Sequence, residues 1–163
     1  MKKLFYIALL LFSVTTVKSQ IAISIGVGTS LLTINGEPSS AASAVCFGFG
    51  MEFQDSTSSI IPMLNFDRNS WSIPGAAANM NLISGGLRIK TSNTPTNFYF
   101  SGSFGVDSKG EFIFLLPGIG MDFRLSRKSS LFLDAKYALV VSGNVLEFIS
   151  LRAGIRVKKK KKN

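Results

Sequence analysis

The chain has 163 residues, enough for one domain. Its 14 phenylalanines and 15 glycines, with charged residues at only 17%, favour β structure. The net charge is +9, but eight of the 18 basic residues lie before residue 19 or in the lysine run 158–162. The part between holds ten basic and nine acidic residues, so nucleic-acid binding is not expected.

Two residue types that carry much of enzyme chemistry are scarce or absent. Cys46 is the single cysteine, which excludes an internal disulfide and a multi-cysteine metal site. The chain has no histidine, which excludes a Ser-His-Asp triad, a Cys-His pair and a His-ligated zinc site. The sequence therefore predicts a protein that is not an enzyme and that holds neither a cofactor nor a metal.

The first 19 residues have the pattern of a secretory signal peptide. A basic start is followed by the apolar run 4–12, and Val17 and Ser19 place a β-branched and a small residue before Gln20. The alternative is an uncleaved anchor, but the apolar run is too short to span a bilayer. We expect three parts: a signal peptide over 1–19, a β domain over 20–157 and a lysine-rich tail over 158–163.

The rest of the chain alternates between large apolar residues and small or polar ones. In the stretch 45–53 the odd positions are Val, Phe, Phe, Met and Phe, and the even positions are Cys, Gly, Gly and Glu. This period of two predicts a strand. Its nine residues are close to the roughly 9–11 that a tilted strand needs to cross a bilayer.

The same pattern predicts eight strands, over residues 21–28, 44–53, 60–66, 80–90, 98–106, 112–125, 131–141 and 145–157. Two long loops are expected at 29–43 and 67–79. Pro117 lies on the apolar face of its strand and predicts a bulge, because proline cannot donate to a ladder. Eight strands in an up-and-down order predict an all-β, antiparallel, closed barrel.

The two faces of the strands indicate which side of the barrel is outside. The face without large apolar residues is mostly Gly, Ser and Ala, which suits a narrow and crowded interior. A soluble barrel would instead need a charged outer face. We therefore assign the Phe, Ile and Leu face to lipid, which makes the barrel a transmembrane one. Cys46 then faces the interior and is expected to be inert.

Nine charged residues fall on the small-residue face, in the half of the barrel that holds the chain termini. Buried charges must be paired, so we predict an interior salt-bridge layer. The layer comprises Glu52, Arg88, Lys90, Asp122, Arg124, Asp134, Lys136, Arg152 and Arg156. For Lys90 and Arg156 the alternative is a solvated position beside a turn. Trp71, with Tyr99 or Tyr137, is a candidate for an interfacial girdle, and Trp71 alternatively packs within a loop.

The final strand, Ile-Ser-Leu-Arg-Ala-Gly-Ile-Arg-Val at 149–157, and the segment Phe-Leu-Asp-Ala-Lys-Tyr at 132–137 resemble the small outer-membrane β-barrel family of OmpA/OmpX type. The resemblance implies residence in the outer membrane of a Gram-negative-type cell, contact with outer-membrane lipid, insertion by the assembly machinery and a monomeric state. The family usually ends on an aromatic residue. Here the last strand ends at Val157, and lysines follow.

The function expected from these features is a structural or surface-interaction role, with the loops 29–43 and 67–79 outside the cell. The sequence does not indicate an extracellular partner. One alternative is a narrow, porin-like pore for small solutes, and another is a soluble lipocalin-like carrier of an apolar ligand. A lipid-modifying enzyme is disfavoured by the absence of histidine. The lysine tail is expected to be solvated or to touch acidic lipid or cell-wall polymer.

Overall fold

The computed structural model describes residues 20–34, 37–54, 58–73, 76–91, 94–108, 112–141 and 145–159. The predicted signal peptide at 1–19 and the tail residues 160–163 lie outside these ranges. In the part of the chain that is described, no helix has the length and apolar character needed to cross a bilayer.

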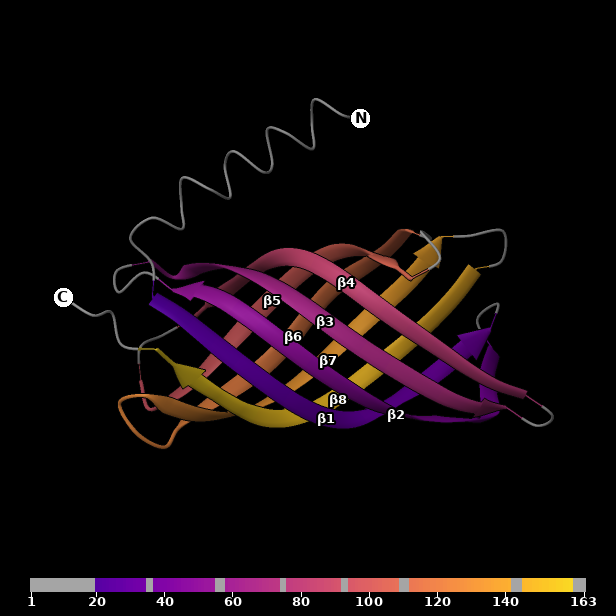
Figure 1. The fold of residues 1–163 in the computed structure, drawn as a ribbon, viewed down its shortest axis with the longest axis horizontal. Helices are drawn as coiled ribbons and strands as arrows, with labels where there is room; N and C mark the ends of the chain where they lie inside the picture. Colours follow the sequence, from indigo (N-terminus) through magenta and orange to yellow (C-terminus); the bar gives the residue numbers. More distant parts are fainter. Residues whose placement is uncertain are drawn as a thin grey trace, which may run out of the picture.

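Eight antiparallel strands close into one barrel in sequence order, with β1 paired to β8 (Figure 1). This confirms the predicted all-β, eight-stranded, up-and-down barrel. The strands are β1 (Gln20–Ile34), β2 (Glu37–Gln54), β3 (Ile60–Ile73), β4 (Ala76–Lys90), β5 (Thr96–Asp107), β6 (Phe112–Arg124), β7 (Ser129–Val141) and β8 (Val145–Lys158).

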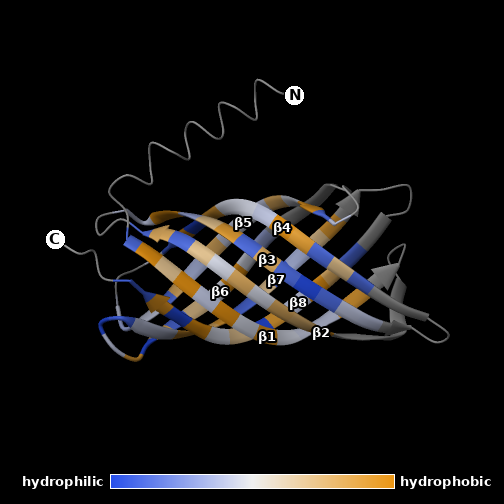
Figure 2. Ribbon diagram, in the orientation of Figure 1, coloured by the Kyte–Doolittle hydropathy of each residue, from blue (hydrophilic) through white to orange (hydrophobic). Residues whose placement is uncertain are grey.

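The alternation in the sequence separates the two faces of the barrel as predicted. Phe47 and Phe49 are 44% and 37% exposed on the outside. Cys46, the neighbour of Phe47 on the same strand, is 1% exposed and faces the interior. Figure 2 shows the resulting exchange of hydrophobic and hydrophilic residues along the strands. The barrel is therefore inverted relative to a soluble one, with a belt of large apolar side chains outside.

The outer apolar belt has the height of a membrane. On β1 it runs from Ile21 to Leu31. At about 3.3 Å per residue and a tilt of about 40°, this segment rises roughly 25 Å along the barrel axis. Transmembrane β-barrels carry an apolar band of about 25 Å. The dimensions therefore agree with the assignment of this face to lipid.

The prediction of long loops at 29–43 and 67–79 is wrong. β1 continues to Ile34 and β2 begins at Glu37, while β3 continues to Ile73 and β4 begins at Ala76. The ladder pairs Arg68 with Asn81 and continues to the pair Ile73 and Ala76. Outward positions above the apolar belt meet water rather than lipid, so they need not be apolar. The alternation that reveals a strand is lost there although the backbone pairing continues.

The bulge expected at Pro117 is present. The register between β6 and β7 shifts between Leu116 and Ile119. The register between β5 and β6 shifts in the same region, between Ser101 and Ser103. The irregularity follows from proline, which has no N–H to give to a neighbouring strand.

Candidate functional site in the barrel interior

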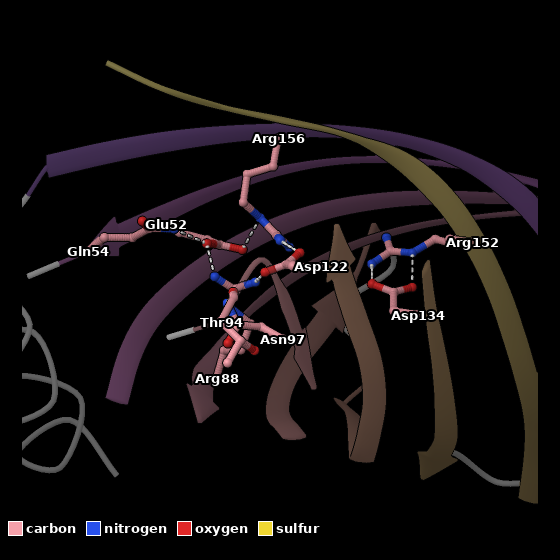
Figure 3. Close-up of polar contacts among 9 residues, drawn as sticks. All are labelled: Glu52, Gln54, Arg88, Thr94, Asn97, Asp122, Asp134, Arg152 and Arg156. Atoms are coloured by element: carbon pink, nitrogen blue, oxygen red, sulfur yellow. Dashed lines mark hydrogen bonds and ion pairs between the residues drawn. The ribbon is translucent and has the colours of Figure 1, made fainter. Parts of the chain in front are cut away.

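Four buried charged residues form a closed ring of ion pairs across the barrel (Figure 3). Arg88 donates from Nη2 to Glu52 Oε2 at 2.7 Å and from Nη1 to Asp122 Oδ2 at 2.8 Å. Arg156 contacts the same two carboxylates, with Nε 2.8 Å from Glu52 Oε1 and Nη1 paired with Asp122 Oδ1. Each carboxylate thus bridges two guanidinium groups. We call this set of Glu52, Arg88, Asp122 and Arg156 the ion-pair ring.

The strands place these four side chains at one level. They come from β2, β4, β6 and β8, the strands that run towards the end of the barrel where β1 begins. Each lies two residues before the last residue of its strand. Equal distance from the strand ends explains why residues far apart in sequence meet. We call this end of the barrel the terminal end.

Two aromatic side chains pack against the arginines of the ring. The Tyr99 ring lies with its centroid 4.8 Å from Arg88 Cζ and 5.7 Å from Arg156 Cζ, and the Phe132 centroid is 5.0 Å from Arg156 Cζ. These contacts have cation–π geometry. Tyr99 is buried, so the candidate girdle position for it is wrong. Tyr99 lies two and four residues before Ser101 and Ser103 on β5, so its side chain points to the same inward face as theirs.

Glycines make the room that these aromatic side chains occupy. A Cβ added at Gly120 would overlap the Tyr99 ring, and one added at Gly26 would lie 2.8 Å from Phe132 Cζ. Small residues at these inward positions therefore leave the space that the Tyr99 and Phe132 rings occupy.

A second group of buried charges centres on Arg152. Its Nε and Nη2 donate to the two carboxylate oxygens of Asp134, each at 3.0 Å, and its Nη1 pairs with Asp67. A Cβ added at Gly48 would overlap Arg152 Nη1 and lie 2.5 Å from Asp67 Oδ1. We call Asp67, Asp134 and Arg152 the Arg152 group.

Asp67 is a charged residue that sequence reasoning missed. It lies within the region predicted as a loop, but in the structure it belongs to β3 and is buried. The signal that could have found it is the alternation of Asn65, Asp67 and Asn69 with Leu64 and Phe66. That alternation continues the strand pattern with polar residues on the inward face.

The remaining three predicted layer residues lie elsewhere. Lys136 is buried, and it lines a cavity of about 20 Å³ together with Asp134 and Arg152. Lys90 is half-buried and Arg124 is exposed, and both line an open cavity at the terminal end. Neither belongs to the ion-pair ring. Arg156, for which a solvated position was the alternative, is buried in the ring.

Buried apolar side chains lie in the half of the interior away from the termini. Trp71 and Phe148 contact edge to face, with ring centroids 5.4 Å apart and an interplanar angle of 68°. Leu32 and Leu82 are buried in the same half. Trp71 is 3% exposed, so it is neither a girdle residue nor a loop residue, and both predictions for it are wrong.

The described residues of the interior enclose a small cavity and offer no metal site. The cavity between the ion-pair ring and the Arg152 group has a volume of about 20 Å³, which is room for about one water molecule. In the described ranges, no cluster of three or more His, Cys, Asp or Glu side chains could hold a metal ion.

No protein-family model matches the sequence, and no curated protein is significantly similar to it. Solved structures are similar in fold. Neisserial surface protein A superposes with a TM-score of 0.67 at 12% identity, covering 85% of this chain and 97% of that protein. Ail, the attachment invasion locus protein of Yersinia pestis, gives a TM-score of 0.54 at 14% identity, covering 85% and 99%.

The chain has the fold of the small outer-membrane β-barrels. The de novo designed protein TMB2.3 is also similar, with a TM-score of 0.58 at 14% identity over 88% of this chain and 96% of that one. At these identities the likeness of this outer-membrane-type barrel to its neighbours is one of fold. The resemblance inferred from the sequence is confirmed at that level, and the predicted outer-membrane location agrees with it.

Proposed function

We propose that the protein is a closed, non-conducting barrel of the outer membrane with a structural or surface-interaction role. The observation that carries this proposal is the ion-pair ring. Its two guanidinium groups and two carboxylates come from β2, β4, β6 and β8 and span the barrel. Each positive group is paired with both negative groups. Eight-stranded barrels have interiors that side chains can fill.

A pore would require this ring to open. Arg88 would have to leave both Glu52 and Asp122, exposing buried charges that now satisfy one another. Separating a buried charge from its partner costs about 3–5 kcal/mol. In the other half of the interior, the buried side chains of Trp71 and Phe148 pack against each other. Both features support the proposal of a non-conducting barrel.

A soluble carrier of an apolar ligand would need an apolar cavity inside the barrel. The described interior is charged in one half, and the cavity between its two charged groups holds about 20 Å³. The large apolar side chains, such as Phe47 and Phe104, point outwards. The distribution supports a barrel in lipid rather than a carrier.

The strands beyond the apolar belt support the surface part of the proposal. Asn79 on β4 is exposed on the outside, and its ladder partner Ser70 on β3 is half-exposed. β3 continues three residues beyond Ser70, which is about 10 Å at roughly 3.3 Å per residue. A polar extension of the sheet, in place of the long loops first expected, would present the protein at the cell surface.

We further propose outer-membrane lipid and the assembly machinery as partners, with a monomeric barrel. The closed β1–β8 seam leaves no unpaired strand edge in the described barrel that would call for another chain. The expectation that the protein is not an enzyme stays a prediction, and it rests on the absence of histidine.

Planar-bilayer recording of the refolded protein tests the proposal. We expect no steps of constant conductance, because the ion-pair ring spans the interior. Reproducible unitary steps would show a pore and overturn the closed-barrel proposal. Recovery of the protein from cells in the soluble periplasmic fraction, without detergent, would overturn the membrane assignment.

A further inference from the structure

A second layer of inward-facing residues lies beyond the ion-pair ring at the terminal end. Each member is the last residue of its strand, two positions after a ring residue, and residues two apart on a strand point the same way. All four border a cavity of about 380 Å³. They are Gln54, Lys90, Arg124 and Lys158. Arg127 from the β6–β7 turn also lines this cavity, which we call the terminal cup.

The floor of the terminal cup is closed and electrically neutral. Asp122 and Arg156, which line the cup, belong to the ion-pair ring and are bound to Arg88 and Glu52 beneath it. Asp122 is the one carboxylate among the described residues of the lining. A small molecule that enters the cup therefore meets a blind end rather than a channel.

Among its described residues, the wall of the cup carries positive charge without a matching carboxylate. Among the residues that the structure describes, the ion pairs include none from Lys90, Arg124, Arg127 or Lys158. Figure 2 shows mostly hydrophilic residues at this end, over the β6–β7 turn and the start of β1. Cations gathered around a concave site raise the local concentration of anions.

We infer that the terminal cup binds an anion of the phosphate class. Two lysine ammonium groups and two arginine guanidinium groups enter from β4, β6, β8 and the β6–β7 turn. A phosphate group carries up to two negative charges and accepts hydrogen bonds on several oxygens, which suits donors that converge from different sides. The cup has space for a phosphate with a small organic substituent.

The phosphate could reach the cup from two sources. Val157 and Leu131 are exposed on the outer apolar face near the terminal end, close in the ladder to Lys158 and Ser129. The cup therefore lies near the level of lipid headgroups, and it also opens to water. A phospholipid headgroup and a soluble phosphate ester share the chemistry, and experiment separates them. This inference goes beyond the proposed function, because a closed barrel could exist without a ligand.

Calorimetric titration of the refolded full chain in zwitterionic detergent, with inorganic phosphate as the probe, is the first arm. In the second arm the protein is placed in nanodiscs of phosphatidylcholine with a minor share of phosphatidylglycerol, and the lipid that remains bound is identified by native mass spectrometry. Saturable phosphate binding assigns a soluble source, and preferential retention of phosphatidylglycerol assigns a headgroup. No binding in either arm would overturn the inference.

The decisive variant is the double substitution Lys90→Gln with Arg124→Gln. Its matched control is Lys128→Gln with Lys159→Gln, which removes two exposed cations near the same end that do not line the cup. We expect the first pair to weaken binding by about tenfold or more and the control by about twofold or less. Equal weakening in both pairs would show general attraction and overturn the site.

Two further measurements keep the test decisive. Arg127→Gln changes a turn residue outside the strands, so it tests the cup even if the double variant does not refold. It is expected to weaken binding, and unchanged binding in both cup variants would contradict the inference. Succinate, a dicarboxylate, is the competing probe, and binding as tight as that of phosphate would overturn the assignment to the phosphate class.

Discussion

Arg88 on β4 and Arg156 on β8 contact the same two carboxylates, so neither arginine has a partner of its own. Both also lie against the Tyr99 ring. The ring is thus a single unit, and the loss of one member leaves the others incompletely paired. This coupling makes the interior sensitive to substitutions that would be mild on the surface.

Arg88→Met tests this coupling. The substitution keeps much of the side-chain volume but leaves Glu52 and Asp122 with Arg156 as their common partner in the ring. We expect a loss of about 3–5 kcal/mol in the free energy of unfolding, as for other broken buried pairs. Urea unfolding of the barrel in lipid vesicles measures it.

The control for Arg88→Met is Arg127→Met. Arg127 lies in the β6–β7 turn and is exposed. Its replacement is expected to change the unfolding free energy by about 0.5 kcal/mol or less. A similar loss of unfolding free energy in both variants would show that the ion-pair ring does not stabilise the barrel more than a surface arginine does.

Gly120→Ala is expected to destabilise the barrel through overpacking. The added Cβ would overlap the Tyr99 ring and lie 2.7 Å from the Leu133 carbonyl oxygen. Overpacking of this kind typically costs about 1–3 kcal/mol. Gly85→Ala is the matched control, because a Cβ there meets nothing within 4 Å. Unfolding curves that are the same for the two variants would contradict the predicted crowding.

Trp71 is the single tryptophan of the chain and reports directly on the interior. Because it is buried beside Phe148, we expect its fluorescence to resist quenching by brominated lipids. The control is Phe49→Trp combined with Trp71→Phe, which moves the tryptophan to a lipid-facing position. Strong quenching of the native protein, equal to that of the control, would place Trp71 at the lipid surface instead.

Membrane orientation is tested by thiol labelling in intact cells. Cys46 is buried, and Cys46→Ser provides a background without an accessible thiol. In that background, Asn79→Cys on the exposed extension of β4 is expected to react with a membrane-impermeant maleimide added outside. Lys128→Cys, at the terminal end, is expected to react only after the outer membrane is opened. The reverse pattern would invert the proposed topology.

The sequence predicted much of the candidate site, because each charged residue of the ion-pair ring lies at the same distance from the end of its strand. Glu52 and Asp122 were predicted to meet cations in one layer, and the structure places both with Arg88 and Arg156. The buried positions of Asp67 and Trp71 were not predicted. Both residues lie in the second half of β3, near the edge of the apolar belt. Outward residues there are polar, so the alternation of apolar and polar residues is hard to recognise.

The sequence by itself determined the number of strands and the direction of their apolar faces. The physical reason is local, since neighbouring residues on a strand point to opposite sides and lipid accepts only apolar ones. Only the tertiary structure decided which charges share a partner. Strand tilt and stagger bring residues from β2, β4, β6 and β8 to one level, and that alignment depends on closure of the whole barrel.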